Sequence, residues 1–180
     1  MTNATKAALE ASLKKLLLKK PLDKITINDL TTDCGISRMA FYYHFKDIYD
    51  LVEWTFLTDN TQSLSGKRSY ATWQQGYLQI FDYVRENKSF IKHVYYSEGR
   101  EILTRFLYDI TYKLLLGVID ERAEGIVVDE EDKAFIAHFY KYGFVGMVLE
   151  WIESGMKEEP KRLISHCLLY TSPSPRDKRQ

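Results

Sequence analysis

The chain has 180 residues, of which 45% are hydrophobic and 28% charged, which is typical of a folded globular protein and excludes a disordered one. Lys and Arg number 25, as do Asp and Glu, so the formal net charge is zero and a uniformly basic protein is excluded. No apolar run approaches the roughly 20 residues that span a bilayer, and the N-terminus lacks the apolar core of a signal peptide.

The first helices have clear start and stop signals. A first helix is predicted by leucines at helical spacing, namely Leu9, Leu13, Leu16 and Leu17. Pro21 ends it, because proline cannot continue a helix. Thr26 is a suitable N-cap for a second helix, with Asp29 in the capping-box position. Gly35 ends this second helix.

Residues 27–46 read as helix, tight turn and helix in about 20 residues, the pattern of a helix-turn-helix. Ser37 caps the third helix, which is predicted to run through Phe45, and Asp47 caps a fourth to about Asn60. An apolar inner face can be formed by Leu30, Ile36, Ala40, Phe41 and Phe45. The opposite face of the third helix then presents Arg38, Met39, Tyr42, Tyr43 and Lys46.

That outward face suits contacts with DNA, because it mixes cations, hydroxyls and apolar groups. A groove-bound helix reads bases mainly from its N-terminal residues, which places Ser37, Arg38 and Met39 at the reading end. Tyr42, His44 and Lys46 are further along, where phosphates are the expected contacts. Residues 1–50 carry 8 basic and 6 acidic residues against 14 and 18 in residues 51–166, a small difference in the same direction.

Spacing alone leaves ordinary packing open as an alternative. Helical hairpins with glycine at the turn occur in many all-α proteins without DNA binding. Tyr42 and Tyr43 could be half-buried aromatics, and His44 could be a capping or core histidine. We expect Cys34 to pack as a small hydrophobe, since no basic group is arranged to activate its thiolate.

The remainder of the chain also predicts helices. The polar stretch from Ser63 to Ser69 reads as a linker. Helices are expected over residues 70–86, 89–96, 98–121 and 130–155 and from Pro160 onward, with a loop and a brief β-like run at 125–128.

Three strings carry a family resemblance: Ile25 to Leu30, Cys34 to Arg38, and Phe41 to Asp47 followed by Asp50-Leu51. They resemble the DNA-binding domain of TetR/AcrR-type transcriptional regulators over about residues 5–56. Ile48 is a departure, because the family often has lysine there. The remainder, with 140–146 and 150–156, looks like a branch common in Gram-positive bacteria that includes dihydroxyacetone kinase regulators.

The resemblance implies an all-α fold with a three-helix DNA-binding domain at 1–50 and a regulatory helical bundle at 51–166. It implies a homodimer that binds a palindromic operator and is controlled through its C-terminal domain by a small molecule or a protein; repression and activation both stay open. The DNA-binding residues are then Thr26, Ser37, Arg38, Met39, Tyr42, Tyr43, His44 and Lys46. The alternative is a helical adaptor that acts through a protein partner without binding DNA.

In such regulators the last two long helices form a four-helix interface across the dimer. The predicted helix at 130–155 carries too much apolar surface for a solvated helix. Gly143 and Gly146 cost about 1 kcal/mol each in a helix, which close approach of another helix would offset. An intrachain contact would offset it equally. The expected interface comprises Phe139, Tyr142, Gly143, Gly146, Met147 and Glu150.

Aromatic residues on the other helices of the body could line a small-molecule pocket, since bundle interiors are common ligand sites. The candidates are Trp73, Tyr77, Phe81, Phe106 and Tyr112. Aromatics at helical spacing are more often simply core.

No catalytic motif is present, so we expect neither enzyme activity nor a cofactor or metal. The four histidines have no i, i+4 partner of metal-ligand type, and there is no phosphate-binding glycine loop. Two cysteines, Cys34 and Cys167, are too few for a disulfide framework, so we expect a cytoplasmic protein.

The C-terminal residues 167–180 have an unusual composition. One reading frame of a transposase adapter used in sequencing libraries encodes Cys167 to Asp177, so we expect these residues to be adapter read-through. A natural disordered tail is the alternative, and neither would contribute to function.

Overall fold

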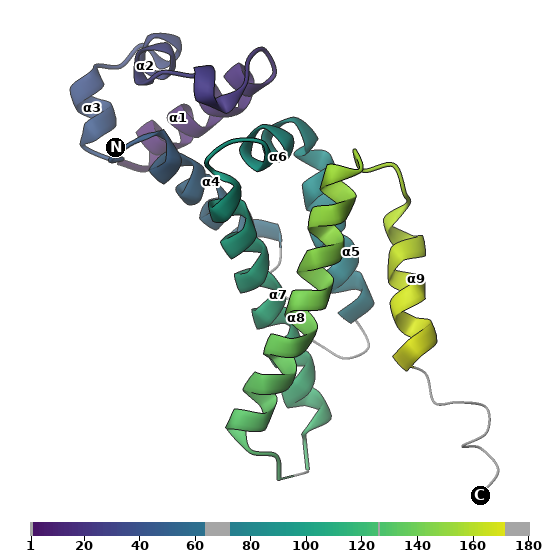
Figure 1. Cartoon of the computed structure of the whole chain (residues 1–180). Coiled ribbons are helices and arrows are strands. Elements are labelled where there is room, and N and C mark those ends of the chain that lie inside the picture. The colour runs from purple at the N-terminus through teal and green to yellow at the C-terminus, as the bar shows by residue number, and fades with distance from the viewer. Residues whose placement is uncertain (1, 64–72, 126, 172–180) are drawn as a thin grey trace, which may run out of the picture.

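The structure is a computed structural model that describes residues 2–63, 73–125 and 127–171, with side chains described for 4–58, 74–125 and 127–166. The described residues form helices without strands (Figure 1). In chain order these are α1 (Thr2–Leu17), the 3-10 turn η1 (Leu22–Lys24), α2 (Ile27–Cys34), α3 (Arg38–Tyr42), α4 (Ile48–Ser63), α5 (Trp73–Glu86), α6 (Lys88–Tyr95), α7 (Arg100–Arg122), α8 (Glu130–Glu153) and α9 (Pro160–Thr171).

The first helices form a head at one end of the molecule (Figure 1). Its core comes from the apolar faces of α1 to α4, and its fully buried members include Leu9, Leu13, Leu17, Leu30, Phe41 and Leu51. The leucines of α1 thus face inward at the spacing that predicts the helix. Cys34 packs beside them and donates its thiol hydrogen to the Ala8 carbonyl at 3.3 Å, so it joins the end of α2 to α1.

The turn between α2 and α3 has the predicted geometry. Gly35 has a φ of +67°, in the left-handed region that glycine occupies without strain. Ser37 then caps α3 by accepting a hydrogen bond from the Ala40 amide at 3.1 Å. Both ends of the turn are therefore fixed by local chemistry, which sets the direction in which α3 leaves α2.

The helix α3 is shorter than expected, because it ends at Tyr42 and not at Phe45. The amides of His44 and Phe45 both donate to the Phe41 carbonyl, at 2.9 and 3.0 Å, so the last turn tightens there. Asp47 and Asp50 then start α4: Asp47 accepts from the Asp50 amide at 2.9 Å, and Asp50 accepts from the Lys46 amide at 2.9 Å. These caps start α4 at Ile48, so residues 43–47 form the turn between the two helices and do not extend α3.

The helix α4 connects the head to the body. Phe56 is buried and stacks on Phe106 of α7, with ring centroids 4.6 Å apart, and it also contacts Phe90 of α6 at 5.0 Å. Arg105 of α7 reaches Glu53 of α4 at 3.0 Å. A change in the body that moves α7 would therefore move α4.

In the body, α7 and α8 lie against each other as a long antiparallel pair, with α5 and α9 to one side (Figure 1). Phe144 of α8 stacks on Tyr77 of α5 at 3.9 Å, and Trp151 packs edge-on to Phe81 at 5.0 Å. The α8 helix ends at Glu153, because Gly155 adopts a φ of +86° and the Met156 amide returns to the Trp151 carbonyl.

Several sequence-based boundaries lie outside the described residues. These are most of the predicted linker, residues 64–69, the expected start of the next helix at 70–72, and the tail from residue 172. The division at residues 50 and 166 stays a prediction. In the part of the chain that the structure describes, no helix is long and apolar enough to cross a membrane.

Candidate nucleic-acid interface

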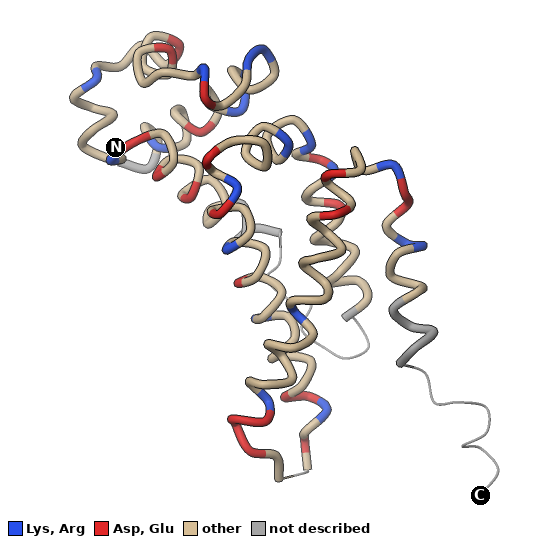
Figure 2. Tube along the Cα trace, viewed as in Figure 1, with Lys and Arg blue, Asp and Glu red and all other residues tan. Residues whose placement is uncertain are grey.

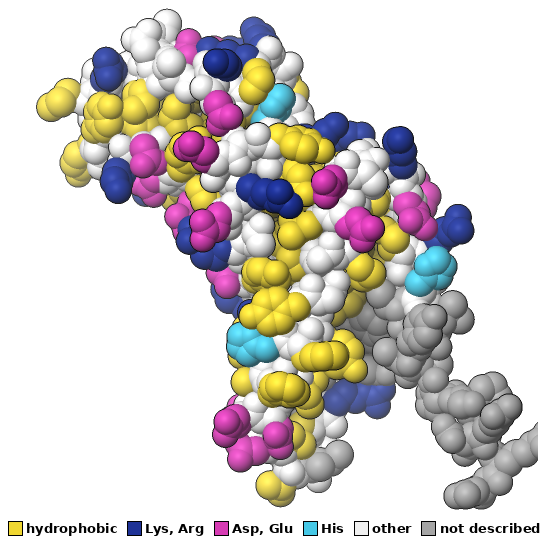
Figure 3. All heavy atoms as spheres, viewed as in Figure 1, with side chains coloured by type: hydrophobic (Ala, Val, Ile, Leu, Met, Phe, Trp, Pro, Cys, Tyr) yellow, Lys and Arg dark blue, Asp and Glu magenta, His cyan; other side chains and the backbone are white. Residues whose placement is uncertain are grey.

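The helix α3 presents a polar and aromatic face to solvent. Met39 is 81% exposed, Tyr43 78% and Tyr42 50%, and Arg38 is exposed beside them. Phe41 and Phe45, on the opposite side, are 0% and 2% exposed. The predicted orientation is confirmed: the phenylalanines hold the helix in the core while its arginine and tyrosines point outward. Figure 3 shows apolar and basic side chains exposed together over the head.

Some basic side chains of the head are paired with carboxylates, and others are not. Lys15 and Lys20 are tied to carboxylates, to Asp33 at 2.5 Å and to Asp29 at 2.7 Å. Arg38 and Lys46 are exposed and have no carboxylate partner among the residues that the structure describes. Acidic residues occur in the head and also at the start of α8, at the other end of the molecule (Figure 2). An anion can therefore approach Arg38 on α3 and Lys46 just after it without displacing an ion-pair partner among the described residues.

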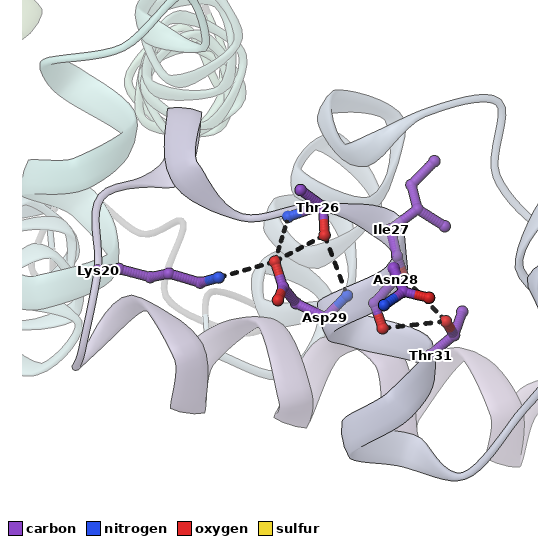
Figure 4. A network of polar contacts seen from close by, with 6 residues as sticks. All are labelled: Lys20, Thr26, Ile27, Asn28, Asp29 and Thr31. Atoms are coloured by element: carbon purple, nitrogen blue, oxygen red, sulfur yellow. Dashed lines mark hydrogen bonds and ion pairs between the residues drawn. The ribbon is translucent and has the colours of Figure 1, made fainter.

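A polar network fixes the start of α2 (Figure 4). The Thr26 hydroxyl accepts from the Asp29 amide at 3.1 Å and donates to the Asp29 carboxylate at 2.7 Å, and that carboxylate accepts from the Thr26 amide at 2.7 Å. The predicted capping box is confirmed. Because the Thr26 hydroxyl hydrogen is already used, its side chain holds the helix; its contact with DNA stays a prediction.

Lys20 completes this network, a role that sequence reasoning missed. Its ammonium reaches Asp29 from the chain segment between α1 and Pro21, across nine positions of sequence. No spacing rule pairs residues on either side of a proline break, so only the folded turn reveals the contact. Lys6 was missed for the same reason: its ammonium lies 5.5 Å from the Phe45 ring centroid and 5.7 Å from that of Trp54.

The carboxylate of Asp29 makes the head sensitive to acid. Hydrogen bonds from Lys20 and then from Thr26 lower its pKa from 3.8 to about 2. Because the pKa is lower in the folded than in the unfolded chain, the ionised group stabilises the head above pH 3.8, and this contribution disappears as the pH falls toward 2.

We therefore expect Asp29→Asn to lower the thermal stability at neutral pH, and the gap from the wild type to narrow between pH 4 and pH 2. Thermal unfolding followed by circular dichroism at several pH values measures it. Lys20→Met should reproduce part of this change in pH dependence, since it removes the largest cause of the shift. A gap of constant size down to pH 2 would count against the network.

His44 and Cys34, two other residues with sequence-based predictions, pack against neighbouring groups. His44 is half-buried, and its ring lies edge-on to Tyr43 at 4.9 Å. Burial raises the pKa of the Cys34 thiol, which opposes thiolate formation and agrees with a packing role. No group of acidic, histidine or cysteine side chains within the described ranges could hold a metal ion.

A family model described as "Transcriptional regulator C-terminal region", one of the TetR models, matches residues 71–171. The chain belongs to the TetR family of transcriptional regulators. As a TetR-family member it is a DNA-binding transcriptional regulator. The family match covers the body, while the α2–α3 geometry described above belongs to the head.

Solved structures share the TetR fold. "Dihydroxyacetone kinase operon activator DhaS" is similar with a TM-score of 0.72 and 21% identity, over 92% of this chain and 93% of that one. NalD of Pseudomonas aeruginosa, described as the secondary repressor of the MexAB-OprM multidrug efflux pump, has a TM-score of 0.61 and 14% identity, over 93% and 94%. No curated protein sequence matches the chain. These identities show a common fold alone, so the Gram-positive branch stays a prediction.

In the TetR body, three of the five aromatic residues predicted to line a ligand pocket are core residues. Tyr77, Phe81 and Phe106 are buried and stack on or pack edge-on to other rings, as described above. Tyr112 is half-buried against His138 at 4.7 Å, and the side chain of Trp73 lies outside the described residues. A ligand site formed by these residues stays a prediction.

A small hollow of about 40 Å³ lies instead between α4 and α7. Phe106 is the one predicted pocket residue in its wall, which also includes Glu53, Leu57, Arg105 and Lys113. It has room for little more than a water molecule.

The predicted dimer surface is on the outward side of α8. Phe139 and Tyr142 are 66% and 55% exposed, and Gly143, Gly146 and Glu150 are exposed on the same side, with Met147 half-buried. Among the described residues, apart from the adjacent residues and the backbone of α8 itself, no heavy atom lies within 4 Å of the position that a Cβ would occupy at either glycine, so no described helix of this chain covers them. Val145 and Ile152 of the same helix are buried in the chain's own core.

Proposed function

We propose that this regulator binds a palindromic operator as a homodimer, with α3 of each head in a major groove, and that it works in the cytoplasm without catalytic activity. The observation that carries the proposal is the outward surface of α3 and of the turn that follows it. Arg38 and Lys46 are exposed and lack a carboxylate partner among the described residues, and Phe41 anchors the helix from behind. A cationic and aromatic face on a rigidly held helix suits phosphate and base-edge contacts together.

The second copy is supported by the uncovered side of α8. An exposed stripe of aromatic side chains interrupted by glycines allows another helix to approach closely, and Figure 3 shows apolar side chains grouped over this helix. Two heads related by a two-fold axis would match an operator whose half-sites are about one DNA turn apart.

Control through the body would act on the contact between α4 and α7. Phe56 and the Glu53–Arg105 pair join α4, which begins in the head, to α7. A small molecule or protein that favours one position of α7 would change the separation of the two heads, and thereby the affinity for the operator. Repression and activation are both compatible with this arrangement.

Binding to the upstream region of the regulator's own operon tests the proposal. Fluorescence anisotropy should show affinity that falls steeply as salt rises, since phosphate neutralisation releases counterions. Absence of salt-sensitive binding to any fragment, with a protein partner captured at high salt, would favour the adaptor alternative instead.

Two variants should separate the roles of Arg38 on α3 and of Lys46 in the turn after it. We expect Arg38→Ala to cost about 1–3 kcal/mol on the operator and much less on unrelated DNA, because a base contact carries the discrimination. Lys46→Ala should weaken both DNAs alike and reduce the slope of log affinity against log salt by about 0.9 for each phosphate that is no longer neutralised. An equal weakening on operator and unrelated DNA for Arg38→Ala would contradict a reading role.

A further inference from the structure

An apolar side chain projects from α3 into solvent. Met39 is 81% exposed, follows Arg38 directly, and is the second residue after the Ser37 cap. Its helix has only five residues, so few side chains share the N-terminal end from which a groove-bound helix reads bases. A flexible thioether therefore projects into solvent at the end of the helix that would face base edges in a major groove.

The fold does not need Met39. The packing of α3 comes from Phe41, which is fully buried, and from the neighbouring Phe45. Methionine is common in cores because it fills irregular gaps, but this side chain fills none. Because Met39 is exposed, replacing it should change DNA recognition without changing the stability of the fold.

Its chemistry restricts what it can recognise. A thioether donates no hydrogen bond and is a weak acceptor, so it cannot read the donors and acceptors of base edges or bind phosphates strongly. In the major groove, the apolar feature that distinguishes one natural base from the others is the C5-methyl group of thymine. We propose that Met39 is a specificity-determining residue that contacts a thymine methyl group in each operator half-site. This proposal rests on the DNA binding proposed above.

Arg38 predicts which base lies next to the contacted thymine. A guanidinium beside the thioether matches guanine, whose O6 and N7 accept two hydrogen bonds from arginine. Adjacent positions on a helix reach neighbouring base pairs, so the half-site should hold a guanine close to the thymine that Met39 contacts. Tyr42 and Tyr43 follow at the other end, Tyr42 as the last residue of α3 and Tyr43 as its C-cap.

The test uses the full chain and duplexes in which single thymines are replaced by deoxyuridine, which removes the methyl group and keeps the pairing. The operator comes from the upstream region or from selection out of random duplexes. For the wild type, one position per half-site should show a loss of affinity of roughly fourfold, the value of one buried methyl group, and about 15-fold when both half-sites are changed.

Variants of Met39 then assign the effect. Met39→Ala should weaken binding to the thymine duplex and abolish the difference between thymine and deoxyuridine at that position, while Met39→Leu should keep most of the difference. Leu18→Ala is the matched control, because Leu18 is also apolar and 74% exposed but lies at the end of α1, next to the residue whose carbonyl accepts from Ser89 of the body. It should leave the deoxyuridine profile unchanged.

The possible outcomes are distinct. A deoxyuridine effect at one position that disappears in Met39→Ala supports the proposal. A wild-type profile without such a position, or an equal weakening for Met39→Ala on both duplexes, overturns it and leaves DNA binding itself intact. Retention of no duplex by the wild type overturns the proposed function and the methyl contact with it, and a partner protein that no longer binds Met39→Ala would then identify α3 as a protein-binding surface.

Discussion

Phe41→Ala should lower the free energy of unfolding by about 3–5 kcal/mol and abolish operator binding. Phe41 is fully buried, and its ring contacts Phe45 with centroids 5.9 Å apart. Removing the ring leaves a cavity directly behind the proposed reading surface, so α3 is deprived of its support as well as of apolar packing. Urea unfolding followed by circular dichroism, together with fluorescence anisotropy on the operator, measures both effects.

The control for this variant is Tyr43→Ala. Tyr43 is two positions away but 78% exposed, so its removal should change stability by less than about 0.5 kcal/mol. Any decrease of DNA affinity in Tyr43→Ala then reports an interaction with DNA made by a folded head. Stability of Phe41→Ala close to that of the wild type would show that the ring is not a packed element of the core.

Phe139→Glu should convert the proposed dimer to monomers and reduce operator affinity by roughly 100-fold or more, because the second head is no longer tethered to the first. The side chain is 66% exposed within one chain, so the substitution should leave the helical content of each monomer unchanged. In a two-fold interface the new carboxylate appears twice, so two charges lose water without a compensating partner. Sedimentation equilibrium measures the oligomeric state.

Tyr96→Glu is the matched control for the dimer surface. Tyr96 is similarly exposed, at 61%, but lies at the end of α6 and not on α8. The same new charge there should leave the oligomeric state and the operator affinity close to those of the wild type. A Phe139→Glu protein that still sediments as a dimer and binds the operator normally would place the interface elsewhere.

The head was largely predictable because its signals are local. The Thr26 and Asp29 pair, the left-handed glycine at 35 and the Ser37 cap each act within four residues, so the chain specifies them before any packing occurs. The side of α3 that faces solvent also followed from spacing, since Phe41 and Phe45 are one helical turn apart. Their burial left Arg38 and Met39 outward.

Features that depend on distant parts of the chain were not predictable. The contact of Lys20 with Asp29 crosses a proline, and the stacking of Phe56 on Phe106 joins residues fifty positions apart. The early end of α3 is a local feature by contrast: Asp47 and Asp50 cap α4 within four residues, and helical periodicity does not show where one helix ends before the next begins. Helical periodicity identified Tyr77, Phe81 and Phe106 as inward-facing aromatics, but it could not show which rings they contact in the core.

Hydrogen exchange measured with and without the operator duplex tests the central claim most directly, namely that the outward side of α3 is the DNA-reading surface. We expect the duplex to slow exchange most strongly in peptides that cover residues 37–46, while peptides from α8, whose outward side belongs to the proposed dimer surface, change little in a protein that is already dimeric. Protection centred on the body, with residues 37–46 exchanging equally fast in both samples, would contradict the claim.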